Sequence, residues 1–155
     1  MQPAVSDSTS VPQGTNRGLF LAVAILSLAG AVVSAISLQR HYAKSATEFC
    51  DFSQKFSCDI VNRSEYSSLA GIPVAGIGLA GYLALMLLST LWRSRFETPV
   101  RLLAASGAGL AFALYLTYIE AYRLETWCIL CLTSLLLIFL ITVLAISIKL
   151  KNANA

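Results

Sequence analysis

The residues of this chain best suited to chemistry are its four cysteines, which fall into two pairs. Cys128 and Cys131 enclose two residues, whereas Cys50 and Cys58 enclose seven. Cysteines at positions i and i+3 of a helix share a face, so their sulfurs can bond to each other. Two pairs with no cysteine left over predict a thiol–disulfide relay.

Three structural interpretations compete with a relay. The cysteines could be inert side chains buried in a membrane helix, or could form a fixed disulfide between a loop and a helix. They could also hold a zinc ion, but zinc ligands are usually two to four residues apart, so the wide spacing of Cys50 and Cys58 argues against it. No metal site is predicted.

The closely spaced pair opens a long hydrophobic run, and its two members differ in expected depth. Cys128, at the start of the run, should lie nearer the water, where an incoming thiol could exchange with it. Free backbone N–H groups and the helix dipole should stabilise a thiolate there. Cys131 should lie about one turn deeper, facing a molecule dissolved in the membrane. A lipid quinone is the abundant electron acceptor at that depth.

Composition places these pairs in a membrane protein. Apolar residues make up 57% of the 155 residues and charged residues only 12%, with a mean hydropathy of +0.72. The chain is long enough for one domain, so we expect any soluble partner to be another chain. The net charge of +3 is spread along the loops, and no Lys/Arg run suggests nucleic-acid binding.

The expected fold is an all-α integral membrane protein, a four-transmembrane-helix bundle with a long outer loop between its first two helices. Each expected span has the roughly 20 apolar residues that a crossing needs. A cleaved signal peptide at the first segment is the less favoured alternative. Residues 1–18 should form a disordered cytoplasmic tail, 19–148 the membrane domain and 149–155 a second cytoplasmic tail. The four expected spans are Leu19–Leu38, Gly71–Trp92, Pro99–Tyr122 and Cys128–Ile148.

Orientation follows from the short connection between the second and third spans. Arg93, Arg95 and the nearby Arg101 oppose one acid there, Glu97, and short positive loops are typically cytoplasmic. We therefore expect an inner (plasma) membrane protein with both termini in the cytoplasm. All four cysteines would then face the periplasm or the cell exterior, where disulfides persist.

The order and spacing of these residues resemble the vitamin K epoxide reductase family, including its bacterial disulfide-forming members. The resemblance extends from about Leu19 to Ile148. In the other class of quinone-coupled membrane oxidases, the Cys-x-x-Cys pair lies in the first outer loop, whereas here that loop carries the wide pair. The resemblance rests on Cys50-Asp51, Cys58, Ser64, the small residues from Gly71 to Gly76, and the pair Cys128 and Cys131 opening the last span.

The resemblance implies a role for each of these residues. Cys128 and Cys131 would form the active-site disulfide, with Cys131 passing electrons to a quinone of the ubiquinone or menaquinone (vitamin K) type. Cys50 would meet a thioredoxin-fold dithiol partner, and Cys58 would pass electrons inward through a transient Cys58–Cys128 disulfide. Ser64 would bind the quinone head group, although a helix-capping serine is the structural alternative.

Two departures from the vertebrate enzymes favour a plain quinone over an epoxide as substrate. Leu135 stands where those enzymes carry a tyrosine, and the second span has no asparagine. The fused thioredoxin-like domain of many bacterial members is also absent, which again suggests a separate partner. The expected activity is disulfide formation coupled to a quinone. The alternatives are a quinone or epoxide reductase for quinone recycling and a non-catalytic membrane subunit with structural disulfides.

Two titratable residues near the outer ends of the spans complete the candidates. Glu120 lies close to the end of the third span, where a solvated carboxylate at the interface is favoured over a role in proton transfer. His41, the only histidine, follows the first span and is interpreted as a headgroup contact rather than a catalytic base.

Overall fold

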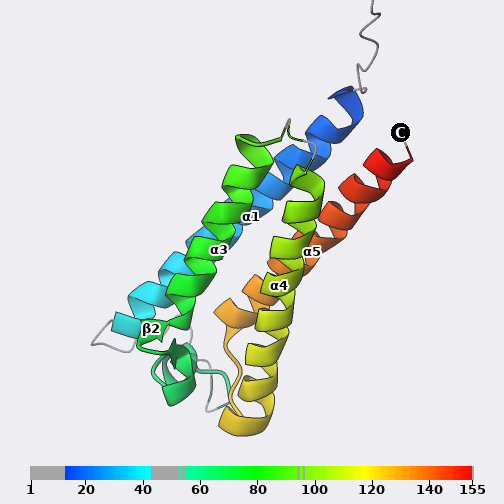
Figure 1. The fold of residues 1–155 in the computed structure, drawn as a ribbon. Helices are drawn as coiled ribbons and strands as arrows, with labels where there is room; N and C mark the ends of the chain where they lie inside the picture. Colours follow the sequence, from blue (N-terminus) through cyan, green and yellow to red (C-terminus); the bar gives the residue numbers. More distant parts are fainter. Residues whose placement is uncertain (1–12, 43–52, 54, 94, 96, 155) are drawn as a thin grey trace, which may run out of the picture.

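Four long helices run side by side in the computed structural model, which describes residues 13–42, 53, 55–93, 95 and 97–154 (Figure 1). The helices are α1 (Gln13–Tyr42), α3 (Val74–Thr90), α4 (Thr98–Ile119) and α5 (Ile129–Ala153). Among the described residues, α1, α5 and the helical stretch Thr98–Leu124 are long and apolar enough to cross a membrane. The prediction of an all-α membrane protein is confirmed in this form.

Helix α3 is shorter than the sequence pattern suggests, because the segment expected at Gly71–Trp92 is helical only from Val74 to Thr90. Its 17 residues give a length of about 25 Å, somewhat short of the roughly 30 Å hydrocarbon layer. The residues just before Val74, which were expected to be helical, belong instead to a small hairpin of strands. Ala70 and Gly71 have positive φ angles of 52° and 83°, which reverse the chain before the helix. That α3 is a fourth span stays a prediction.

The other helices extend beyond the expected limits. Helix α1 begins at Gln13, inside the segment expected to be a tail, and ends at Tyr42. Helix α5 continues through Lys149 and Lys151 to Ala153. Hydropathy locates only the apolar part of a helix. The helix can continue through charged and polar residues beyond that part, so its ends differ from the expected limits.

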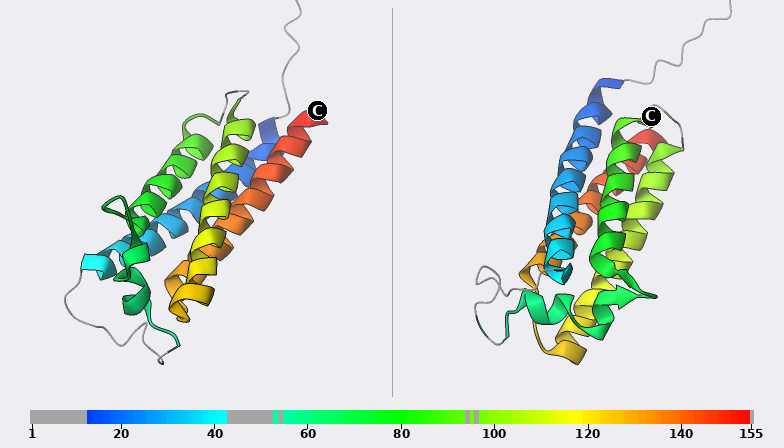
Figure 2. Two further views of the ribbon diagram at one scale, coloured as in Figure 1. Left: turned by 60° about the horizontal axis from the view of Figure 1, so that its bottom comes forward. Right: turned by 90° about the vertical axis from the view of Figure 1, so that its left-hand side faces the viewer.

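Short elements close one end of the bundle (Figure 2). They are α2 (Cys58–Asn62), η1 (Glu65–Ser67), the antiparallel strands β1 (Ser68–Leu69) and β2 (Ile72–Pro73), and the π-helical turn η2 (Glu120–Leu124). Helix α2 begins where the side chain of Ser57 accepts a hydrogen bond from the N–H of Ile60. The segment before α2 is tied to the start of α5, since the N–H of Trp127 donates to the carbonyl of Lys55 at 2.8 Å.

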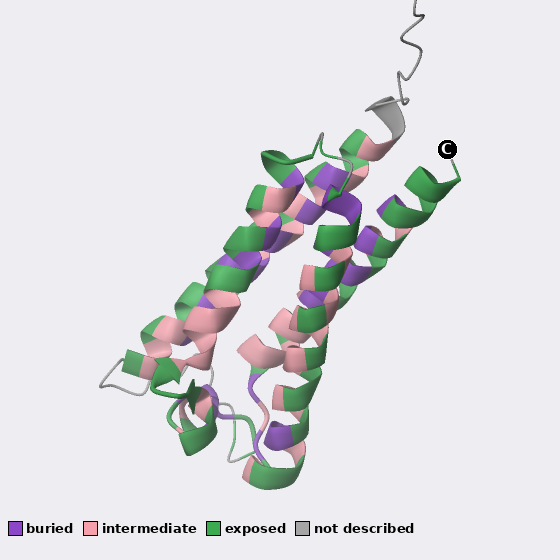
Figure 3. Ribbon diagram, viewed as in Figure 1, coloured by how far each residue is buried: buried purple, intermediate pink, exposed green. Residues whose placement is uncertain are grey.

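The bundle is packed from inside, while its outer faces stay apolar. Tyr82 of α3 is buried against α1, where a Cβ at Gly30 would overlap the tyrosine ring. The Tyr82 hydroxyl donates to the carbonyl of Ser134 in α5 at 2.8 Å and so links a third helix. Leucines, isoleucines and aromatic residues remain exposed along the outer faces of the helices (Figure 3). Such apolar faces are typical of helices that lie in lipid.

Candidate functional site

Three of the four cysteines meet at the end of the bundle that the short elements close. Cys58 is the first residue of α2, Cys128 is the N-cap residue of α5, and Cys131 lies in the first turn of that helix. Cys58 and Cys128 are both 0% exposed and share one apolar cluster with Val61. Cys131 packs against this cluster from the side of α5. Cys50 lies outside the described residues.

The side chains of these three cysteines are in contact in series. Cys128 is hydrogen-bonded through its side chain both to Cys58 and to Cys131. Residues 55–73, which connect α1 to α3, are called the outer segment below. Cys128 therefore lies between a sulfur from the outer segment and a sulfur from α5. Thiol–disulfide exchange needs an attacking sulfur next to the sulfur it attacks, and this arrangement provides that on both sides of Cys128.

Two expectations for Cys128 are wrong. It was expected to be accessible to an incoming thiol, but the outer segment covers it completely, and Cys131 is the more exposed of the two. It was also expected to be a stabilised thiolate at the start of a helix. The hydrogen bond with Cys131, together with burial, raises the pKa of Cys128 above that of an ordinary thiol, and the contact with Cys58 opposes this only in part.

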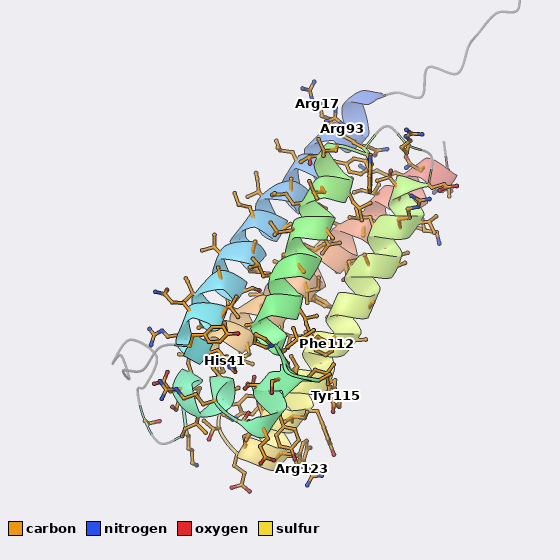
Figure 4. All side chains as sticks on the ribbon, turned by 60° about the vertical axis from the view of Figure 1, so that its left-hand side comes forward. Arg17, His41, Arg93, Phe112, Tyr115 and Arg123 are labelled. Atoms are coloured by element: carbon orange, nitrogen blue, oxygen red, sulfur yellow. The ribbon has the colours of Figure 1, made fainter. Side chains whose placement is uncertain are left out.

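A cavity of about 380 Å³ lies beside this cluster, between α1, α3, α4, α5 and the outer segment. Its wall is mainly apolar, with contributions from Phe112 and Leu116 of α4. Figure 4 shows Phe112 toward the end of the bundle that carries His41 and Arg123, opposite to Arg17 and Arg93. Cys131 belongs to the wall, whereas Cys128 does not. The two members of the pair thus face different surroundings, one toward Cys58 and one toward the cavity.

Ser64 lies on the cavity wall and occupies the position before η1. Its hydroxyl donates to the carbonyl of Val61 at 2.8 Å and makes no capping hydrogen bond to η1. The hydroxyl oxygen keeps lone pairs that can accept a hydrogen bond. Ser64 therefore stands at the capping position of η1, but its side chain does not cap the helix.

Asn62, which the sequence analysis did not single out, is the better-placed hydrogen-bond donor. Its Oδ1 accepts a hydrogen bond from Ser37 at 3.0 Å, which fixes the orientation of the amide. Its Nδ2 is buried without a hydrogen-bond partner among the described residues, and the residue belongs to the cavity wall. An amide donor left over in a buried wall suits a ligand that carries a carbonyl oxygen.

His41 makes protein contacts at this end of the bundle. Its Nδ1 is 2.5 Å from the carbonyl oxygen of Asn62 and 3.4 Å from the hydroxyl of Ser67. The short contact requires Nδ1 to carry the proton that it donates to Asn62. Through Nδ1, His41 therefore anchors α2 to α1, and its interpretation as a headgroup contact stays a prediction.

The environment of Glu120 also differs from the one expected from the sequence. It is 2% exposed, whereas a solvated carboxylate was expected. The turn η2 carries the chain inward after α4, and Glu125 closes that turn with a positive φ of 48°. The Glu120 carboxylate consequently lies beneath the start of α5, where it accepts a hydrogen bond from the N–H of Cys128 at 3.2 Å. The available signal in the sequence was an acid placed eight residues before the Cys-x-x-Cys pair.

Comparison with known protein families agrees with this site. The model of the vitamin K epoxide reductase family matches residues 21–146, which includes all four long helices in large part and all four cysteines. The match covers most of the chain. The protein therefore belongs to the vitamin K epoxide reductase family, whose members are membrane oxidoreductases that act on thiol pairs or quinones.

Proposed function

We propose that this protein oxidises the dithiol of a thioredoxin-fold partner outside the cytoplasm and passes the electrons to a lipid quinone. The observation that supports the proposal most directly is the contact series from Cys58 through Cys128 to Cys131, which ends at a mainly apolar cavity. A disulfide that served only as a structural staple would need neither a third sulfur in contact with it nor a cavity beside it.

Electrons move inward through successive exchange reactions. A thiolate of the partner attacks Cys50 of a Cys50–Cys58 disulfide, which forms a mixed disulfide between the partner and Cys50 and releases the Cys58 thiolate. The second thiol of the partner then attacks its own partner sulfur in this mixed disulfide, which leaves Cys50 and Cys58 reduced. The Cys58 thiolate attacks Cys128 of the Cys128–Cys131 disulfide, which releases the Cys131 thiolate. Cys50 then attacks Cys58, which re-forms the outer disulfide and leaves Cys128 and Cys131 reduced.

The cavity fits a quinone head group by its residues. The mainly apolar wall suits the ring, the free Nδ2 of Asn62 can donate to a carbonyl oxygen, and Ser64 lies on the same wall. A bound quinone would supply the acceptor for the two electrons and two protons that leave the reduced Cys128–Cys131 pair. Cys131 is the residue of the pair that faces this acceptor, while Cys128 is fully buried away from water.

The direct test is dithiol oxidation by the full chain reconstituted in liposomes that contain a ubiquinone or menaquinone. A reduced thioredoxin-fold protein should become oxidised while an equal amount of quinol forms. Omission of the quinone should stop the reaction once both disulfides of the protein are reduced. Quinol absorbance and thiol titration measure the two products. A donor that stays reduced would contradict the proposal, and turnover of a quinone epoxide as fast as of the quinone would favour the recycling alternative.

The proposed orientation places the cysteine cluster outside the cell. Arg17 and Arg93 lie at one end of the bundle and Arg123 lies at the other (Figure 4). Helix α5, which carries Lys149 and Lys151, ends beside the start of α1, at the same end as Arg17. Positive charge at the far end from the cluster is the pattern of a cytoplasmic face.

Labelling of intact cells tests this orientation. In a variant with all four native cysteines replaced by alanine, Arg123→Cys should react with a membrane-impermeant maleimide, while Asn154→Cys should react only after the cells are permeabilised. Both positions are exposed, so access across the membrane decides the result. The reverse pattern would place the cysteine cluster in the reducing cytoplasm and would overturn the proposed direction of electron flow.

A further inference from the structure

Glu120 is an ionisable side chain in a place where a charge is costly. Its side chain is buried between η2 and the start of α5, and among the described residues it forms no ion pair. Transfer of an unpaired carboxylate into a dry site is strongly unfavourable. Ionisable residues buried at membrane depth are therefore functional candidates.

The two oxygens of the carboxyl group have different surroundings. Oε2 accepts the hydrogen bond from the N–H of Cys128, whereas Oε1 is buried and has no hydrogen-bond partner among the described residues. The thiol of Cys131 interacts with the same carboxyl group, and Glu120 belongs to the cavity wall together with Cys131. Among the described residues, the titratable groups that face Cys131 are Glu120 from η2, Cys128 from its own helix end, and Cys58 from α2.

A structural role does not require the negative charge. The oxygen of a glutamine amide could accept the same N–H hydrogen bond from Cys128 without the cost of burying a carboxylate. A carboxylate differs from a glutamine amide in that it can also accept a proton. The Cys131 thiol, which must lose its proton when the pair is oxidised, lies beside it.

We propose that Glu120 is the proton acceptor for Cys131 and exchanges protons between this thiol and the cavity. The inference rests on the proposed function. As the dithiol becomes a disulfide, the Cys131 proton passes to the Glu120 carboxylate and the Cys128 sulfur forms the bond to Cys131 as its own proton leaves. Two electrons and two protons leave the pair for the quinone, one of these protons by way of the Glu120 carboxyl group, which returns to a carboxylate.

Infrared difference spectroscopy on the quinone-free protein tests the proposal without turnover. The full chain in detergent is reduced with dithiothreitol and then oxidised with diamide, and the two spectra are subtracted. Without a quinone to take the proton, Glu120 should keep the proton that it accepts from Cys131. In the native protein, a carbonyl-stretch band of a protonated carboxyl group should therefore appear on going from the dithiol to the disulfide state, and the band should shift in D₂O. Glu120→Gln should lack this band, whereas Glu125→Gln, the same change at a nearby exposed acid, should retain it.

Turnover with quinone gives the second readout. Glu120→Gln should reduce quinone about a hundredfold more slowly or worse, in the range expected for loss of an acid–base group, while Glu125→Gln stays near the native rate. Identical spectra in the carboxyl region for Glu120→Gln and the native protein, or a native rate in Glu120→Gln, would overturn the inference. If the native protein shows the carboxyl band but never couples dithiol oxidation to quinone, the proposed function fails and the carboxyl–thiol pair stands.

Discussion

Replacement of Cys131 by alanine should abolish quinone reduction with every thiol donor, by at least about a thousandfold. Cys131 is the one cysteine among those described that belongs to the cavity wall, so no other described sulfur can replace it at the acceptor. The loss should be equal for a protein donor and for a small dithiol, because both deliver electrons upstream of this residue. Quinol formation in reconstituted liposomes measures the effect.

Thr133→Ala provides the matched control for this variant. Thr133 is exposed on the same turn of α5, and its hydroxyl only donates back to the carbonyl of Ile129 at 2.8 Å. The control should fold and turn over like the native protein. Near-native turnover in Cys131→Ala would mean that the quinone receives its electrons from another residue and that the proposed order of the relay is wrong.

Much of the architecture could be predicted from the sequence because hydropathy and residue spacing are local properties. The apolar runs gave the positions of the long helices, and the spacing of Cys128 and Cys131 gave their common face. The residue at which α3 begins was less predictable. Gly71 and Pro73 are apolar enough to continue the run, but they form a turn and a short strand before the helix starts.

The environment of the site was harder to predict, since it depends on which segments cover one another. Nothing local to Cys128 shows that the segment between Lys55 and Asn62 folds over it, and this cover removes the water that a stabilised thiolate would need. Likewise, the π-helical turn η2 changes Glu120 from an interfacial carboxylate to a buried one. Asn62 gives no signal of its own, because its importance arises from a partner, Ser37, that lies in another helix.

Complete burial of Cys128 has a consequence for specificity. A small thiol in solution cannot approach a sulfur that is 0% exposed, so the natural route to Cys128 is through Cys58, which touches it. The outer segment therefore acts both as carrier and as cover. Such an arrangement would keep the inner pair from oxidising or reducing thiols other than those that the outer pair accepts.

The same contact predicts that a mixed disulfide can be trapped. In the relay, the bond between Cys58 and Cys128 is transient because Cys50 can resolve it by attacking Cys58 and Cys131 can resolve it by attacking Cys128. In Cys131→Ala, the Cys128 thiol can attack Cys58 of the Cys50–Cys58 disulfide and release Cys50, and no thiol on the side of α5 remains to resolve the new bond. A Cys58–Cys128 bond should therefore accumulate relative to the native protein. Because both sulfurs are buried, the trapped bond should also resist small reductants unless the protein is unfolded.

Proteolytic cleavage between α3 and α4 makes this bond visible. Cys58 and Cys128 then lie on different fragments, which should stay together on a non-reducing gel and separate after denaturation with reductant. Mass spectrometry of the linked peptides identifies the two cysteines, and the double variant Cys131→Ala with Cys58→Ala should give separate fragments throughout. A fixed structural staple would instead give one bond that is unchanged by donor and quinone. If Cys131→Ala showed only a Cys50–Cys58 bond and never a link to α5, the outer and inner pairs would not exchange electrons. The contact between Cys58 and Cys128 would then be a matter of packing alone.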